Sequence, residues 1–526
     1  MGKGVAASSI GALLESRGLN VRMVKCDPYI NVNAGIMSPL QHGEVYVTDD
    51  GAETDLDLGN YARFTKGRLR QANSITTGQV YESVIRKERE GQYNGLCVQV
   101  IPHITDEIKS RILAVSKEEN DTDVVIVEIG GTVGDIESIP YLEVARQMIH
   151  ERGRNNAISI HLTLIPEVAG GDLKTKPTQH SVKSMQETGI QPDILICRSP
   201  VMLDSPTREK IAQFTNVDSD AVFTSPNIDT TIYQIPIIFF EQKLDQIILR
   251  KMCVESRHAD IRPWNSVMDR FAARSGKARI GVVGEDLEAH DIYISLFESL
   301  FHASLECGVE VEIVKIDSSS LEKTENADEV LRQVDGVLVP GGFGQLGING
   351  MVKAAAWARE NKIPYMGVNL GMHVMIIDWG RNVLKWSDAD SAEFKQDAKR
   401  PVVSLLEEQT GARNNKGIIR LGAGEITLEE GTRILAAYRE KQISERHRHS
   451  YEFSNQFRQD MESSGLKLAA FSSDGKTVEC VEWPGHPWGV GVQFHPEYKS
   501  KPMSVSPLFR DFIESVKKNR SCEKQS

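Results

Sequence analysis

The sequence predicts two domains of the α/β class, each built on a parallel sheet. At 526 residues the chain is too long for a single hydrophobic core, so at least two domains are expected. In both halves short apolar runs alternate with helical patterns, which is typical of parallel strands covered by helices. Around residues 252–277 this alternation gives way to a polar stretch. We therefore predict a first domain at 1–255, a linker with some helix at 256–277, a second domain at 278–517 and a charged, frayed tail at 518–526.

The candidate strands are short apolar runs of the length expected for buried strands. In the first half these runs are Val21–Lys25, Val124–Ile129, Ile158–Ile165, Ile194–Cys197 and Ala221–Thr224. In the second half they are Ala278–Gly284, Gly336–Pro340, Pro364–Val368 and Val490–Phe494.

Charge and cysteine usage restrict the class of protein. The formal net charge of −12 argues against general binding to nucleic acid or to a membrane surface. No stretch approaches the roughly 18 apolar residues of a membrane span, and the first residues do not begin a signal peptide. The seven cysteines are scattered and form no CxxC pair, which indicates a reducing, cytoplasmic compartment and no structural zinc. We expect a cytoplasmic protein with neither a nucleic-acid nor a membrane partner.

The first candidate site combines phosphate-binding and metal-binding residue types. Gly2-Lys3-Gly4 precedes a stretch with helical periodicity, and glycine backbone, a helix N-terminus and a lysine together favour phosphates. Lys25 and Asp27 follow at the end of a predicted strand. Carboxylates in a loop-like, glycine-containing stretch could hold Mg²⁺ against such phosphates. They are Asp49, Asp50, Asp55 and Asp57, and a solvated acidic loop would explain any one of them alone.

Four long motifs resemble the CTP synthase family, in the family's order and across essentially the whole chain. They are KCDPYINVNAG (25–35), SPLQHGEVYVTDDGAETDLDLGNYARF (38–64), VEIGGTVGDIES (127–138) and KTKPTQHSV (174–182). The resemblance implies a P-loop-type, parallel-sheet amidoligase domain in the first half. It also implies a homotetramer with nucleotide sites between subunits.

The resemblance further implies a role for individual residues. Lys3, Lys25 and Asp57 would bind ATP, and Asp57 and Glu128 would hold Mg²⁺. The site for UTP, overlapping that of the feedback inhibitor CTP, would comprise Asp135, Glu137, Lys174, Lys176, Gln179 and Lys210. His42 would lie near the entry of ammonia. The alternative is that Lys174 and Lys176 are solvent-exposed residues of a turn with no role in binding.

The start of the chain departs from the family pattern. Family members begin with a strand and a glycine-rich turn before the Gly-Lys-Gly motif, whereas this sequence begins at that motif. We expect a start assigned too late, because every motif downstream is intact. The alternative is an amidoligase half with impaired ATP binding.

The second domain resembles the class I glutamine amidotransferases, which have a flavodoxin-like fold and a nucleophilic cysteine in a GxCxG turn. Here the turn reads Gly367-Val368-Asn369-Leu370-Gly371, while the family's histidine and glutamate are retained as His495 and Glu497. The oxyanion segment is 340–344, including Gly342. Acyl transfer at this position needs a thiolate, and the neutral carboxamide of Asn369 cannot act as one. We therefore predict that glutaminase activity is lost and that His495 and Glu497 have structural roles.

Other positions of this domain also differ from the family pattern. His373 replaces a glutamine that helps to bind glutamine, and Ser450 replaces an arginine. Leu346 replaces an arginine linked to GTP, which puts activation by GTP in doubt. Glu285-Asp286 replaces the Lys-Tyr of the family's VGKY. Glu393, at a glutamine-binding position, is retained.

The sequence predicts a C–N bond-forming ligase that aminates UTP to CTP with ATP and free ammonia. ATP would phosphorylate the uracil 4-oxygen, and ammonia would then displace phosphate, which requires positioning and charge neutralisation by lysines and Mg²⁺. Two alternatives stay open. One is a catalytically inactive regulatory or assembly paralogue, and the other is an amidoligase acting on a modified pyrimidine nucleotide.

Overall fold

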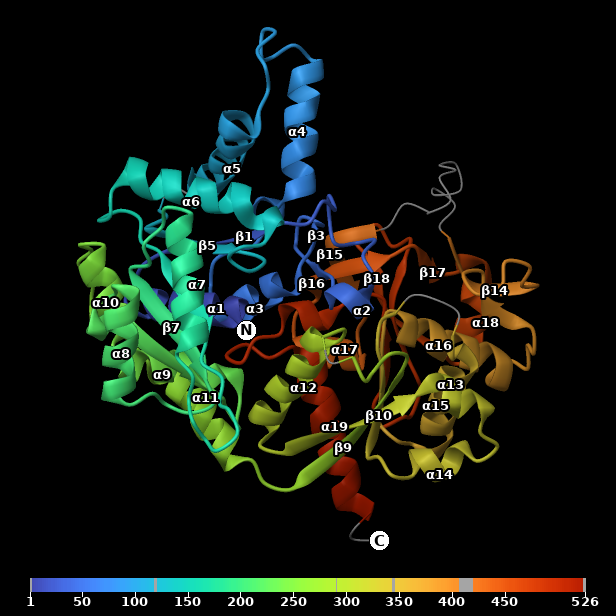
Figure 1. Ribbon diagram of the computed structural model, residues 1–526. Helices are drawn as coiled ribbons and strands as arrows, with labels where there is room; N and C mark the ends of the chain where they lie inside the picture. Colours follow the sequence, from blue (N-terminus) through green and yellow to red (C-terminus); the bar gives the residue numbers. More distant parts are fainter. Residues whose placement is uncertain (1, 118–120, 290, 343–345, 406–419, 524–526) are drawn as a thin grey trace. The chain divides into compact units, whose positions relative to one another are not determined.

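The computed structural model describes residues 2–117, 121–289, 291–342, 346–405 and 420–523, with no side chains described beyond 520 (Figure 1). The chain forms two compact units. The first contains residues 1–37 and 54–269, and the second contains 38–53 and 270–526. The second unit is thus discontinuous in sequence, because a segment from the first tenth of the chain belongs to it.

Within the described residues, the first unit contains two three-stranded parallel sheets, with strand orders β4-β1-β5 and β6-β7-β8. The strands are β1 (Val21–Asp27), β4 (Ser74–Thr76), β5 (Val124–Ile129), β6 (Ile160–Leu164), β7 (Ile194–Ser199) and β8 (Val222–Pro226). The helices are α1 (Lys3–Ser16), α3 (Leu56–Phe64), α4 (Thr77–Arg89), α5 (Thr105–Lys117), α6 (Ile139–Arg152), α7 (Lys176–Glu187), α8 (Ser205–Thr215), α9 (Ile235–Glu241) and α10 (Leu244–Lys251). Helix α11 (Arg262–Ala273) contains the division between the units.

A buried apolar core fixes one end of β1. Val24 and Cys26 of β1 pack with Ile75 of β4 and with apolar residues of α4, α5 and α6, which Figure 1 shows grouped together. The parallel register places Lys25 of β1 directly beside Glu128 of β5. The carboxyl ends of these strands therefore carry opposite charges side by side.

The segment 38–53 is held to the rest of the second unit by polar contacts. It contains α2 (Pro39–His42) and β2 (Tyr46–Val47), which pairs with β3 (Glu53–Thr54). The Glu44 carboxylate accepts hydrogen bonds from the backbone N–H of Ser295 at 3.0 Å and from its hydroxyl at 2.6 Å. Asp49 pairs with Arg446 at 2.6 Å.

The second unit is built on a nine-stranded sheet of order β10-β9-β11-β12-β20-β19-β18-β15-β16 in the described residues. The strands from β10 to β20 in this order are parallel and the others antiparallel. They are β9 (Lys277–Gly284), β10 (Glu310–Asp317), β11 (Gly336–Val339), β12 (Tyr365–Val368), β15 (Arg420–Leu428), β16 (Gln442–His449), β18 (Lys467–Ser472), β19 (Val478–Glu482) and β20 (Gly489–Val492). A small sheet contains β13 (Ala389–Ser391), β14 (Arg400–Leu405) and β17 (Tyr451–Phe453).

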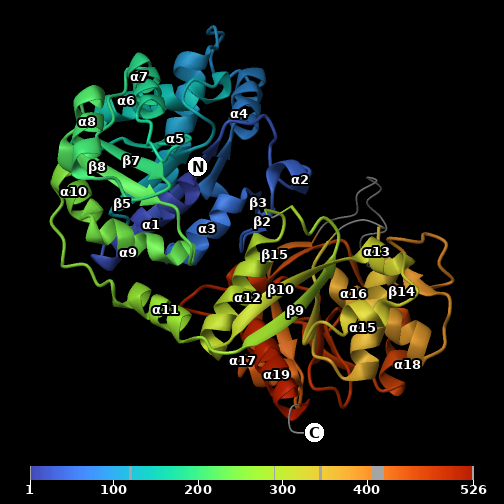
Figure 2. The ribbon, with the colours of Figure 1, turned by 60° about the horizontal axis from the view of Figure 1, so that its bottom comes forward.

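Alternating side chains of the parallel strands fill two cores, one on each face of the large sheet. Ile280 and Val282 face α12 and α19, whereas Val283 and Val337 face α15 and α16 (Figure 2). The helices of this unit are α12 (Ile294–Cys307), α13 (Ser318–Lys323), α14 (Ala327–Leu331), α15 (Ile348–Asn361), α16 (Leu370–Asp378), α17 (Arg433–Tyr438), α18 (Arg458–Ser463) and α19 (Pro507–Glu523).

Each strand predicted from the sequence is present, within about two residues at either end, and the polar stretch contains the predicted helix as α11. Two expectations were wrong. Asp57 lies in helix α3 and not in a loop, because Asp55 caps that helix. The tail does not fray at residue 518, because α19 continues to Glu523; residues 524–526 lie outside the described residues. Among the described helices, none combines the length and apolarity needed to cross a bilayer.

Candidate functional site

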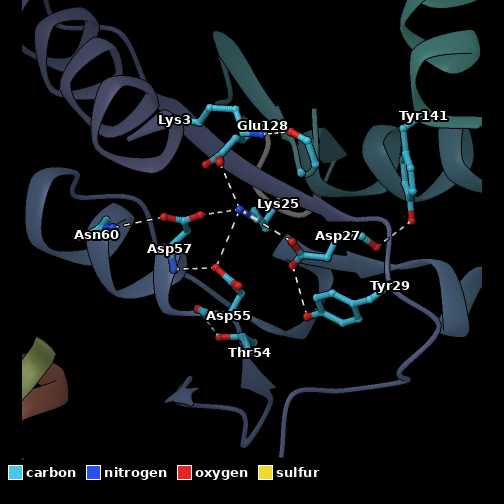
Figure 3. Close-up of polar contacts among 12 residues, drawn as sticks. Lys3, Lys25, Asp27, Tyr29, Thr54, Asp55, Asp57, Asn60, Glu128 and Tyr141 are labelled. Carbon is cyan, nitrogen blue, oxygen red and sulfur yellow. Dashed lines mark hydrogen bonds and ion pairs between the residues drawn. The ribbon is translucent and has the colours of Figure 1, made fainter. Parts of the chain in front are cut away.

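Lys25 lies at the centre of a buried acidic cluster in the first unit (Figure 3). Its ammonium nitrogen is 3.1 Å from a carboxylate oxygen of Glu128, 3.7 Å from Asp27 and 3.8 Å from Asp55. It also donates a short hydrogen bond to Asp57. Four carboxyl groups thus surround one cation.

Local helix chemistry places two of these carboxylates. Asp55 is the N-cap of α3, and its side chain accepts a hydrogen bond from the backbone N–H of Asp57 at 2.8 Å. Asp57 lies in the first turn, where the helix dipole favours a negative charge. Asn60, one turn later, donates to Asp57 at 3.2 Å. The cap therefore points Asp57 at Lys25.

The charges of the cluster do not balance. Burial opposes ionisation of Lys25, but Asp27, Glu128 and Asp57 outweigh it and raise the pKa of Lys25 well above its usual value. For Asp57, Lys25 outweighs burial and lowers the pKa. Burial raises the pKa of Glu128 and raises that of Asp27 well above its usual value. The cluster has more carboxyl groups than positive charges, and an additional cation would lower the repulsion among the carboxylates.

The N-terminus of α1 adds a second positive charge beside this cluster. The Lys3 ammonium donates to the carbonyl oxygen of Gly131, and burial, followed by the nearby charge of Lys25, lowers its pKa against the opposing effect of Glu128. Gly2, at the N-cap, has a positive φ of 83°. A side chain at Gly4 would collide with the Asp57 carboxylate, so the helix start lies close to the acidic cluster. Lysines and a helix N-terminus in one place suit a polyphosphate.

The donor set of the cluster fits Mg²⁺ only together with a ligand's oxygens. In the described part of the chain, no group of three or more His, Cys, Asp or Glu side chains is arranged to hold a metal by itself. Asp57 and Glu128 both contact Lys25 and supply carboxylate oxygens, which are the ligands that Mg²⁺ prefers. Mg²⁺ usually combines one or two carboxylates with phosphate oxygens and water.

The residues predicted to bind a pyrimidine nucleotide come from three places in the first unit. Lys176 is the first residue of α7, Gln179 lies one turn later, and Lys210 is exposed on α8. Asp135 and Glu137 are exposed in the turn between β5 and α6. Lys174, before α7, lies 3.5 Å from Asp172. No ion pair or hydrogen bond joins any two of these six side chains in the structure as described.

In the second unit, Asn369 lies on the sharp turn between β12 and α16. Its φ of 50° and ψ of −101° are unusual for a residue other than glycine, and such strain is typical of functional turns. The side chain is buried, and its amide donates to the carbonyl oxygen of Gln493 at 3.2 Å. A Cβ at Gly341 would lie 2.7 Å from the His495 ring and 3.4 Å from Cβ of Asn369. These three residues therefore lie together.

A histidine–glutamate pair is preserved beside Asn369. Nδ1 of His495 is 2.8 Å from Glu497, whereas Nε2 is buried without a partner among the described residues. The His495 ring stacks on Tyr498 with centroids 5.1 Å apart. Burial disfavours a thiolate at Cys307 and Cys480, because it raises the pKa of Cys307 to about 12 and that of Cys480 well above its usual value.

The other predicted residues of this unit are placed as follows. Nε2 of His373 is 3.0 Å from the Gln493 side chain, and burial lowers the pKa of His373 to about 4. Glu393 follows β13, and burial raises its pKa to about 7. Residues 340–342 of the predicted oxyanion segment, including Gly342, are described, whereas residues 343 and 344 lie outside the described residues. His42 ends α2 in the segment 38–53, and its role at an ammonia entry stays a prediction.

Two contact residues were not singled out from the sequence. Tyr61 donates a short hydrogen bond to Glu128, and Gln493 contacts both Asn369 and His373. Helical spacing could have indicated Tyr61, since it lies four residues after Asp57 on one face of α3. Gln493 lies only two residues before His495, which was singled out from the sequence.

The comparisons with known proteins agree with both units. A family model described as CTP synthase N-terminus matches residues 1–254, and one described as glutamine amidotransferase class-I matches 288–515. The fold and these matches define the class: an α/β synthase domain followed by a class I glutamine amidotransferase domain.

Curated relatives identify the family. The chain is 50% identical to the CTP synthase of Clostridium acetobutylicum over 98% of this chain and 96% of that protein. It is 50% identical to the CTP synthase of Geotalea uraniireducens, over 99% and 97%. The glutaminase domain of Trypanosoma brucei CTPS with bound acivicin is 35% identical and covers 46% of this chain and 94% of that one, with a TM-score of 0.44. The chain belongs to the CTP synthase family, which confirms the predicted α/β class and the prediction of a C–N bond-forming ligase.

Proposed function

We propose that this protein converts UTP to CTP with ATP, Mg²⁺ and free ammonia, through a UTP phosphorylated at the 4-oxygen. The observation that supports this most is the contrast between the two units. The cluster of Lys3, Lys25, Asp57 and Glu128 is assembled in the first, whereas the second has a carboxamide at the nucleophile position.

The first unit has the groups that phosphoryl transfer needs. Lys3 and Lys25 would bind ATP phosphates, and Asp57 and Glu128 would hold Mg²⁺, which when bound neutralises charge on the transferring phosphoryl group. The 4-oxygen of UTP takes the γ-phosphoryl group and ADP leaves. Ammonia then attacks C4 and phosphate leaves, so that the uracil carbonyl becomes the amine of CTP. Asp27 and Asp55 keep Lys25 charged and in place.

Lys174, Lys176, Gln179, Lys210, Asp135 and Glu137 would bind UTP and, as feedback inhibitor, CTP. Their polar groups are mostly exposed and not paired with one another, which leaves them available to phosphates and to a pyrimidine. A homotetramer would complete the nucleotide sites. His42 would lie near the entry of ammonia.

Free ammonia is the proposed amine donor because glutamine hydrolysis lacks its nucleophile. His495 and Glu497 keep the geometry of a base and its orienting group. Asn369 offers them nothing to deprotonate, since its amide nitrogen already donates to Gln493 and has no basic lone pair. We assign the pair a structural role, through the stacking of His495 on Tyr498.

The test is CTP formation from UTP, ATP and Mg²⁺, with ammonium chloride or glutamine as the nitrogen source and potassium chloride as the ionic control. We expect CTP with ammonium and none with glutamine. Binding of UTP and ATP without CTP at high ammonium would overturn the proposal and favour a regulatory paralogue. Turnover only with a modified pyrimidine nucleotide would correct the substrate.

A further inference from the structure

Helix α7 is hydrogen-bonded to strand β6 through polar side chains on the faces that the two elements turn toward each other. The Thr178 hydroxyl lies 3.1 Å from both the hydroxyl of Thr163 and the carbonyl oxygen of Leu164. One turn along α7, the Ser181 hydroxyl is 2.8 Å from Nε2 of His161. Residues three apart share a helix face and residues two apart share a strand face, so the two pairs form one contact row. Hydrogen bonds are directional, and this row therefore fixes the rotation of α7 on the strand.

His161 also lies close enough to Lys3, at the N-terminus of α1, to be affected by its charge. The side chain is 8% exposed, and burial together with the positive charge of Lys3 lowers its pKa to about 4. The ring is therefore neutral at pH 7, and one of its nitrogens can bond Ser181 without adding a positive charge beside Lys3. A positively charged residue at this place would repel Lys3, and an apolar one would leave Ser181 without this partner.

Helix α7 carries residues of the proposed pyrimidine-nucleotide site. Its start is tied down by the backbone N–H of Lys174, which donates to the carbonyl oxygen of Pro166 at 3.0 Å. Lys176 and Gln179 lie within the following turn and a half. A rotation of the helix would move both side chains, while the Lys25 cluster, on other elements, would stay in place.

We propose that His161 is a positioning residue for the pyrimidine nucleotide, acting through Ser181 to set the orientation of helix α7. This inference rests on the proposed function. It assigns His161 no contact with the substrate and no part in phosphate binding by Lys3 and Lys25.

The experiment measures equilibrium binding of UTP, and separately of a non-hydrolysable ATP analogue, by calorimetry without ammonium. The variants are His161→Ala and Ser181→Ala, with His161→Gln to restore a group that can hydrogen-bond to Ser181. His180→Ala is the matched control, because it removes an exposed imidazole from the same helix. We expect both alanine variants to weaken UTP binding about tenfold and to change the affinity for the ATP analogue less than about twofold. We expect the UTP affinity of His161→Gln to lie within about threefold of that of the unchanged protein. The control His180→Ala should bind UTP as tightly as the unchanged protein.

The outcomes separate this inference from the proposed function. If the unchanged protein binds UTP but makes no CTP, the proposed function fails while the variants still test the role of His161. Unchanged UTP affinity in Ser181→Ala, whose smaller side chain does not threaten folding, would overturn the inference. So would an equal loss of both nucleotides, or no recovery in His161→Gln. If the unchanged protein binds no UTP, both proposals fall.

Discussion

The polar centres of the two units differ in how completely their groups are paired. Around Lys25, every carboxylate contacts the lysine, and Asp57 and Glu128 have further partners in Asn60 and Tyr61. Around Asn369, the buried Nε2 atoms of His495 and Gln493 have no partner among the described residues. Buried polar groups without partners are costly and usually mark a site shaped for a ligand or a reaction. The second unit thus has buried polar atoms without partners around a carboxamide, whereas in the first unit every carboxylate of the cluster has a charged partner.

The largest expected effect is on the charged centre. Asp57→Asn or Glu128→Gln should lower the rate of CTP formation with ammonium by at least about 10²–10³-fold, because each removes charge that would hold Mg²⁺ against the phosphates. Glu90→Gln removes an exposed carboxylate of the same unit and is the control. Steady-state rates at saturating nucleotide measure the effect. Near-normal turnover in both variants would show that the cluster is structural.

The second prediction concerns the centre around Asn369. Glutamate release from radiolabelled glutamine should be undetectable, with or without GTP, because Asn369 cannot form an acyl intermediate. Asn369→Cys alone should recover little, since His373 and Ser450 also differ from the family. Adding His373→Gln and Ser450→Arg should recover more. A rate for the unchanged protein within about a hundred-fold of an active family member would contradict the assignment.

The third prediction sharpens the comparison through pH. At a fixed total ammonium concentration, the rate of CTP formation should rise with pH across the neutral range, because NH₃ and not NH₄⁺ is the nucleophile. Rates plotted against the calculated NH₃ concentration should then fall on one line. A rate that follows total ammonium instead would indicate a protein group that deprotonates NH₄⁺.

The smallest expected effect is on stability. The pKa of His373 is about 4 in the folded protein and about 6.5 when unfolded, so between these values only the unfolded chain binds the proton. Stability is therefore lost as pH falls through this window, by about 1 kcal/mol at pH 5.5. In His373→Gln that loss should be absent. Urea unfolding followed by tryptophan fluorescence at pH 7.5 and 5.5 measures the difference, and equal pH dependence in both proteins would contradict it.

The sequence predicted elements and residue types better than it predicted pairings. Apolar runs located the strands because burial on both faces of a parallel sheet requires continuous apolar sequence. The sequence also placed Lys25 and Asp57 in one candidate site, and in the structure their side chains are in contact. The sequence did not predict that Asp57 lies in the first turn of a helix, because that depends on capping by Asp55, two residues earlier.

The long-range contacts carry no signal in the local sequence: the family resemblance grouped Glu128 with Asp57, but nothing predicted the contact of Glu128 with Lys25. Glu128 lies 103 residues from Lys25, and only the strand register brings them together. Likewise, Tyr61 reaches Glu128 from a different element. Such pairs carry no local signal, since each side chain alone is an ordinary polar residue of a helix or strand.

The segment 38–53 has a consequence for anyone who would clone the second unit by itself. The residues of this unit are not contiguous in the sequence. A fragment that starts at residue 270 would therefore omit Glu44, which accepts hydrogen bonds from Ser295 at the start of α12. It would also omit Asp49 and Tyr46, leaving Arg446 with two fewer side-chain partners. A stable excised unit would need these sixteen residues joined back by a linker or added as a peptide. A single continuous stretch of coding sequence therefore cannot encode the second unit by itself.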